Sequence, residues 1–179
     1  MSQERRQGIN GHKLIDLIRQ HIPTDFEPAD FLLAGSARLW AGNVLPRLSD
    51  LDILARPESR TWRRLQELAE MHGPLFGHRS LRTSAITGTT IAVLYGGVIE
   101  ACDTWVLTNR TTDELIESAE VIGGIRYLAI KDVVAYKRQL DRPKDRSDLA
   151  KLRTHRPELV PASPVRHRSP APALSGAVV

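Results

Sequence analysis

The chain has 179 residues, of which 41% are hydrophobic, 26% are charged and only 5% are aromatic. These proportions predict one globular domain with a tail and exclude a machine of several large domains. The formal net charge of +4 allows a nucleic-acid or phosphate partner but does not require one. The single cysteine, Cys102, excludes an internal disulfide framework and a cysteine-based zinc site.

The sequence contains no pattern typical of secretion or of a membrane span. The polar N-terminus leads into no apolar segment, and no stretch approaches the roughly 20 apolar residues that cross a bilayer. Together with the single cysteine, this pattern favours a cytoplasmic protein without a membrane partner.

The first half of the chain alternates short apolar runs with helical patterns. Ser36 and Ser59 are positioned to cap the helices that follow them, and Gly73-Pro74 ends the second of these. In chain order, we predict a flexible arm over 1–12, a helix over 12–21, a strand over 31–34, a helix over 37–41, a strand over 51–55 and a helix over 61–72.

The second half begins with strands and ends with helices. Gly96-Gly97 indicates a hairpin, and Thr111 with Glu114 forms a capping-box pair. We predict strands over 81–86, 90–95, 98–107 and 125–130, helices over 111–120, 131–140 and 145–153, and a disordered Pro/Ala-rich tail over 154–179. The result is an α/β or α+β domain over 13–153, with a small mixed sheet, flanking helices and C-terminal helices.

The most informative chemistry lies at Asp50 and Asp52. Residues i and i+2 of a strand share a face, so both aspartates project the same way, with Cα atoms about 6.6 Å apart. Two carboxylates at this separation can converge on a pair of Mg²⁺ ions. An isolated Asp-x-Asp more often lines the wet face of a strand. Gly35-Ser36 changes this balance, because Gly35 permits a tight turn and Ser36 opens a helix whose N–H groups suit an anion.

The order of these residues resembles the signature of the nucleotidyltransferase superfamily, which has the polymerase-beta-like fold. A hydrophobic run precedes Gly35-Ser36, and after thirteen residues Asp50-Leu51-Asp52-Ile53 follows. The resemblance implies a third carboxylate on a later strand, where the chain offers Glu100 and Asp103. These two face opposite sides of the strand. The resemblance favours Glu100, with Asp103 as the alternative.

A second motif lies late in the chain. Lys137, followed by Arg142-Pro143-Lys144-Asp145 and Asp148-Leu149, is similar to a motif of stand-alone nucleotidyltransferases of the AbiEii-type toxin branch. Asp145 and Asp148 occupy the first turn of a helix, where acids favour the dipole and can hold Arg142 or Lys144. An ordinary capped helix explains these two acids equally well, whereas a phosphate-binding role for Lys137 comes from the resemblance alone.

The resemblance implies a Mg²⁺-dependent, cytoplasmic nucleotidyltransferase that transfers a nucleoside monophosphate from an NTP such as ATP to a hydroxyl. Asp50, Asp52 and Glu100 would be catalytic and hold two Mg²⁺ ions, and Gly35, Ser36 and Lys137 would bind the nucleotide. The acceptor is either a small molecule or an RNA. Toxin-type modification of RNA or protein, with an antitoxin-like partner, stays open, as does an inactive nucleotide-binding module of the same fold.

Other readings of the sequence are weaker. There is no P-loop motif and no paired histidine spacing for hydrolytic zinc, and a glycosyltransferase normally needs a longer chain. Trp40, Trp62 and Trp105 are expected in the core or its rim rather than under a nucleobase. Eight of the 25 Lys and Arg residues but only three of the 21 acids lie within 137–156, so the positive charge is concentrated beside the expected nucleotide site.

Overall fold

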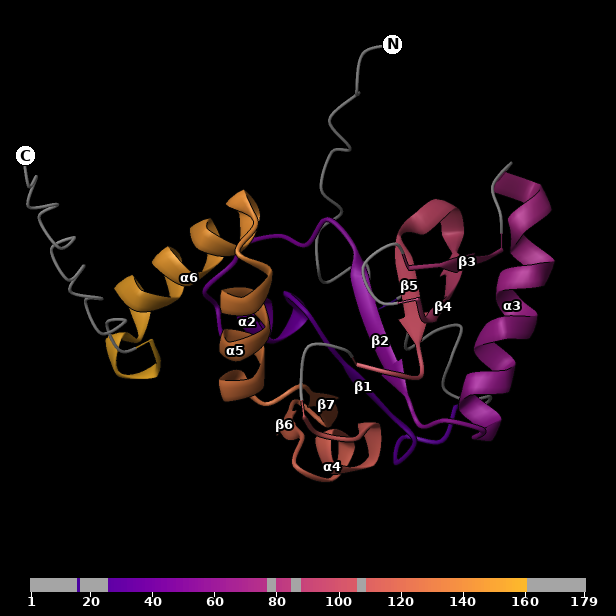
Figure 1. Cartoon of the computed structure of the whole chain (residues 1–179), viewed down its shortest axis with the longest axis horizontal. Coiled ribbons are helices and arrows are strands. Elements are labelled where there is room, and N and C mark those ends of the chain that lie inside the picture. Colours follow the sequence, from indigo (N-terminus) through magenta and orange to yellow (C-terminus); the bar gives the residue numbers. More distant parts are fainter. Residues whose placement is uncertain (1–15, 17–25, 77–79, 85–87, 106–108, 161–179) are drawn as a thin grey trace, which may run out of the picture.

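A computed structural model describes residues 16, 26–76, 80–84, 88–105 and 109–160 (Figure 1). In this part of the chain, seven strands form one mixed sheet in the order β3-β4-β5-β2-β1-β7-β6. The strands are β1 (Phe31–Leu33), β2 (Leu51–Ala55), β3 (Leu81–Thr83), β4 (Thr90–Leu94), β5 (Ile99–Cys102), β6 (Glu120–Ile122) and β7 (Ile125–Tyr127). The helices are α2 (Ala37–Ala41), α3 (Arg60–Phe76), α4 (Thr112–Glu117), α5 (Ile130–Leu140) and α6 (Pro143–His155), with 3-10 turns η1 (Tyr95–Gly97) and η2 (Pro157–Leu159). The fold is therefore mixed α and β, as predicted.

The centre of the sheet is formed by β1, β2 and β5. Strands β1 and β2 run antiparallel, whereas β2 and β5 run parallel. The outer strands are antiparallel hairpins, β3 with β4 on one side and β6 with β7 on the other. Strand β2 has a neighbouring strand on each side and helices packed over both faces, and four of its five residues are buried.

The sheet separates two apolar layers. On one face, Leu51 and Ile53 of β2 pack with Trp62 and Leu65 of α3. On the other face, Leu54 packs with residues of α5 and α6. The two groups of helices lie to either side of β2 in Figure 1. Since side chains alternate along a strand, Asp52 shares the face of Leu54 and is directed toward α5 and α6.

The three tryptophans occupy the core or its rim, as predicted. Trp62 belongs to the apolar layer between the sheet and α3, which we call the α3 layer. Trp105 belongs to the layer between the sheet and α5 and α6, which we call the α5 layer. Both side chains are buried. Trp40 is partly buried and packs against both layers.

Two of the three predicted helix caps are confirmed. The Ser59 hydroxyl accepts a hydrogen bond from the Trp62 N–H at 3.0 Å. Thr111 and Glu114 form the complete capping box. The prediction for Ser36 is wrong, because its hydroxyl makes no capping hydrogen bond to α2 and instead contacts two residues of the C-terminal helices.

Several element boundaries differ from the sequence prediction. Helix α3 continues through Gly73-Pro74 to Phe76, and α4 ends at Glu117. Glu120, predicted as the last residue of a helix, instead begins β6, because Gly123 and Gly124 adopt positive φ and turn the chain into a hairpin with β7. Observed β3 and β5 are shorter than predicted, and the helix predicted over 12–21 lies outside the described residues except for Asp16, which is helical.

The C-terminal part of the fold is longer than predicted. Helix α6 begins at Pro143 and reaches His155, and η2 follows it. Val160 after η2 is buried in the α5 layer. The domain end predicted at residue 153 therefore lies within α6, whereas residues 161–179 lie outside the described part. None of the described helices is long and apolar enough to cross a membrane.

Candidate active site

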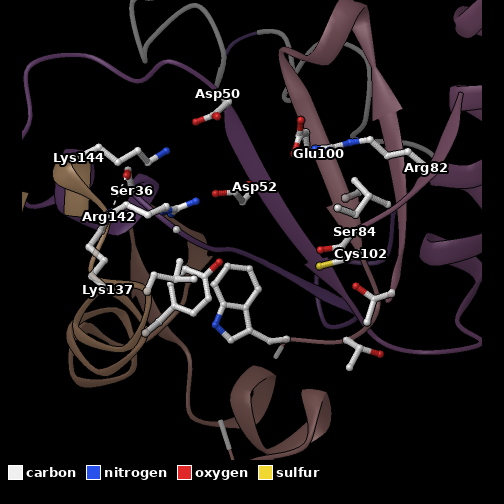
Figure 2. A pocket seen from close by; sticks show the side chains of 18 residues that line it. Ser36, Asp50, Asp52, Arg82, Ser84, Glu100, Cys102, Lys137, Arg142 and Lys144 are labelled. Atoms are coloured by element: carbon white, nitrogen blue, oxygen red, sulfur yellow. Dashed lines mark hydrogen bonds and ion pairs between the residues drawn. The ribbon is translucent and has the colours of Figure 1, made fainter. Parts of the chain in front are cut away.

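A pocket of about 280 Å³ opens where β2, β4 and β5 face the ends of α5 and α6 (Figure 2). One of its walls is made by the strands and the other by the helices. Its lining side chains include three carboxylates, four cationic groups and several hydroxyls. The charged members are Asp50, Asp52, Arg82, Glu100, Lys137, Arg142 and Lys144.

The carboxylates come from two neighbouring strands. Asp50 immediately precedes β2, and Asp52 lies within it. Glu100 of β5 is the register partner of Asp52, because the two strands run parallel. The structure therefore brings Asp50, Asp52 and Glu100 into one pocket. Asp103 is not among the lining residues, and its carboxylate accepts a hydrogen bond from the Thr104 hydroxyl at 3.2 Å.

Gly35 makes room for the second aspartate. The backbone of Gly35 has φ +58°, and a Cβ at this position would lie 2.1 Å from Asp52 Oδ2. The Ala34 N–H donates to the Asp52 carbonyl at 2.8 Å, which fixes the turn beside β2. A residue with a side chain would therefore displace the Asp52 carboxylate. Sequence reasoning assigned Gly35 to the turn and missed this steric role.

Asp52 is held in an environment that disfavours its charge. Burial, followed by the neighbouring charges of Asp50 and Glu100, raises the pKa of Asp52 to about 7. The cations of Lys144 and Lys137 act in the opposite direction but do not compensate. An additional cation would stabilise carboxylates that repel one another in this way.

The residues fit a divalent cation in their chemistry. Carboxylate oxygens are the ligands that Mg²⁺ prefers. Within the described part of the chain, however, no three His, Cys, Asp or Glu side chains are close enough together to hold a metal ion as they stand. Figure 2 shows Glu100 beside Arg82, across the pocket from Arg142 and Lys144. The carboxylates that could bind a cation are therefore present in the pocket, and one of them, Glu100, forms an ion pair with Arg82.

The helical wall is built around Lys137. This side chain is only 2% exposed, and its ammonium lies 3.2 Å from Asp145 Oδ1 and 2.8 Å from Asp148 Oδ2. It also donates to the Ser36 hydroxyl at 3.1 Å. An ammonium group has three donors, and these three contacts account for all of them. Lys137 thus lines the pocket, with its charge in contact with the two aspartates, and its phosphate-binding role stays a prediction.

The turn between α5 and α6 brings these groups together. Asp141 adopts a left-handed conformation with φ 47° at the end of α5, and Pro143 occupies the first turn of α6, where a missing N–H is tolerated. Asp145 then lies in the first turn of α6, fully buried. Burial alone would raise the pKa of Asp145, but hydrogen bonds and charges from Arg142 and Lys137 lower it below its usual value.

Lys144 is the cation of this wall that is free to meet a ligand. It is exposed, lines the pocket, and forms no ion pair or hydrogen bond with another described residue. Its charge is felt by Asp52, whose pKa it lowers. Sequence reasoning treated Lys144 only as a partner for the helix aspartates, although the Arg142-Pro143-Lys144 motif already placed it at the start of α6.

The strand side of the pocket is lined mainly by small polar groups. Ser84, Thr89 and Thr104 supply hydroxyls, and Arg82 supplies one cation. Cys102 lies there too, with its pKa raised to about 12 by burial and then by Asp52 and Asp103. A thiol with this pKa stays protonated at neutral pH and is a poor nucleophile.

Comparison with known proteins adds no relative. No protein-family model, no curated protein sequence and no solved structure matches this chain. The inference of function therefore depends on the residues and geometry of the pocket.

Proposed function

We propose that the chain is a nucleotidyltransferase of the polymerase-beta-like superfamily, which transfers a nucleoside monophosphate from an NTP to a hydroxyl acceptor and releases pyrophosphate. The observation that supports this proposal is the presence of Asp50, Asp52 and Glu100 in one pocket, at β2 and the adjacent strand β5. Gly35 leaves the space that the Asp52 carboxylate occupies. The cluster faces cationic side chains across a single pocket. This order of residues resembles the family signature, with glutamate at position 100 where the family more commonly has aspartate.

The two walls of the pocket would then take different parts of the substrates. Asp50, Asp52 and Glu100 would hold Mg²⁺, which stabilises charge on the attacking and leaving oxygens when bound. Lys144 lies opposite the carboxylates and would neutralise the polyphosphate. The hydroxyl-lined strand side receives the acceptor.

The chemical step is a displacement at the α-phosphorus. The acceptor oxygen forms a bond to this phosphorus, and the bond to the bridging oxygen of the β-phosphate breaks in line with it. The proton of the acceptor hydroxyl passes to the Glu100 carboxylate and then to solvent, and pyrophosphate departs past Lys144. The protein would orient both reactants, with carboxylates near the attacking acceptor oxygen and the Lys144 cation near the departing pyrophosphate.

The test is transfer of label from each of the four α-labelled NTPs to total RNA, to protein and to a panel of polyhydroxylated small molecules. Asp50→Asn is expected to lower transfer at least about 100-fold, since the metal-ligand charge contributes several kcal/mol to the transition state. EDTA is expected to abolish transfer.

Asp103→Asn is the matched control, because the same change is made just after β5 at a residue that does not line the pocket. It is expected to keep near wild-type transfer. Equal activity of the Asp50→Asn variant and the wild type would contradict the mechanism. Nucleotide binding without any transfer would identify an inactive binding module, and the labelled species identifies the acceptor class.

A further inference from the structure

An arginine from the sheet edge neutralises the third carboxylate. Arg82 Nη2 lies 2.5 Å from Glu100 Oε2. The two residues are not on neighbouring strands, since Arg82 pairs with Ile91 of β4 and Glu100 pairs with Val93 of β4. The side chain of Arg82 therefore reaches across the whole width of β4 to make this contact, and Figure 2 shows it extended toward Glu100.

The Arg82 contact involves the carboxylate that neighbours Asp52 in the sheet. Glu100 is the register partner of Asp52, and its charge is one of those that raise the pKa of Asp52. On the other wall, Lys137 and Arg142 are held by Asp145. Arg82 is thus the cation that the strand side of the pocket contributes to the cluster.

The contact is also one that can be broken. The side chains of Arg82 and Glu100 are 45% and 27% exposed, in contrast to the fully buried pair of Lys137 with Asp145. Partly exposed ion pairs are weak because water solvates the separated charges almost as well. Released from Glu100, the long side chain of Arg82 can extend into solvent without leaving a buried charge behind.

We propose that Arg82 is a tethered counter-ion of Glu100, which occupies the third carboxylate until a divalent cation replaces it. Arg82 thereby competes with the cation and sets the concentration at which the cluster is filled. This inference rests on the proposed function, because it takes the cluster to be a divalent-cation site.

The test is binding of Mn²⁺ to the full-length protein without nucleotide, measured from the electron paramagnetic resonance signal of the free ion. Arg82→Gln is expected to bind Mn²⁺ about two- to fivefold more tightly than the wild type, the range set by losing a weak competing ion pair. Arg56→Gln is the control, because Arg56 pairs with Asp30 and Asp113, outside the pocket. Its affinity is expected to equal that of the wild type.

A double-mutant cycle with Glu100→Gln completes the experiment. In the Glu100→Gln background, Arg82→Gln is expected to change Mn²⁺ affinity less than about 1.5-fold, since the carboxylate for which Arg82 and the cation compete is absent. Unchanged or weaker binding by the single Arg82→Gln variant overturns the inference and leaves the proposed function standing. Absence of Mn²⁺ binding in every variant, or binding that Asp50→Asn does not weaken, contradicts both.

Discussion

The helical wall and the strand wall of the pocket hold their buried charges in opposite ways. On the helical wall, Lys137 and Asp145 are 2% and 0% exposed, and each charge has a partner of opposite sign in direct contact. On the strand wall, Asp52 lies between two further carboxylates, and its pKa is raised to about 7, first by burial and then by those neighbours.

The difference suggests separate roles for the two walls of one cavity, with paired charges that stabilise the fold on one wall and carboxylates that can receive a ligand on the other. Buried charges with complete hydrogen bonding hold a fold in one arrangement, and they have no capacity left for a ligand. A carboxylate repelled by neighbouring carboxylates, as Asp52 is, is destabilised in the isolated protein and gains most from an added cation. Under the proposed function, the residues that act are therefore those of the strand wall, together with Lys144.

The largest expected effect is on stability, at the two lysines of the helical wall. Lys137→Met leaves Asp145 and Asp148 without the ammonium group they share, so the free energy of unfolding should fall by about 3–5 kcal/mol. Lys144→Met removes an exposed side chain without a partner and should change it by less than about 0.5 kcal/mol. Urea unfolding at pH 7 measures both. Equal losses for the two variants would show that Lys137 does not stabilise the fold more than Lys144 does.

The second prediction concerns the strand wall, where a substitution is expected to raise the free energy of unfolding. An acid whose pKa is higher in the folded protein than in the unfolded chain makes the protein less stable as pH rises between the two values, from 3.8 to about 7 for Asp52. Asp52→Asn removes this loss. In EDTA at pH 8, it should unfold at a free energy roughly 2–4 kcal/mol above that of the wild type.

Urea unfolding at pH 5, 6, 7 and 8 measures the trend for Asp52. The advantage of Asp52→Asn should shrink toward pH 5, because Asp52 of the wild type is then protonated in the folded state. An advantage that does not depend on pH would mean that the ionisation of Asp52 is not its source.

The smallest of the three effects concerns Gly35. Gly35 and Gly88 both have positive φ, but a Cβ on Gly35 would meet Asp52, whereas one on Gly88 would meet nothing within 4 Å. Alanine at either site bears the same backbone strain. Gly35→Ala should therefore be less stable than Gly88→Ala by a further amount of about 1–3 kcal/mol. Thermal unfolding compares them, and equal losses would argue against close packing of Gly35 on Asp52.

Local sequence patterns predicted most of the elements and the positions of the strand carboxylates. The alternation of Leu51, Asp52 and Ile53 indicates a strand with acids on one face, and the structure has that strand. Capping at Ser59 and Thr111 was predictable because each hydrogen bond joins residues three apart. The fold class followed from the order of these elements.

Contacts between distant segments could not be predicted in the same way. Ser36 was expected to cap α2, but its hydroxyl is hydrogen-bonded to Lys137 and Asp148, more than 100 residues away. Lys137 was expected at a phosphate, and only the fold reveals that two aspartates of α6 have taken its charge. Strand β6 exists because β7 is beside it, which a three-residue pattern does not show.

Helix α6 is held to the domain by two kinds of contact. Near its start, the buried Asp145 forms an ion pair with a lysine of α5. Toward its end, the buried Leu152 and the partly buried Leu149 pack in the apolar layer that also holds Val160. Shortening the chain before Val160 would therefore weaken the apolar contacts and leave the ion pair intact. The position of Lys144 over the pocket would then depend more heavily on the ion pairs of the first turn.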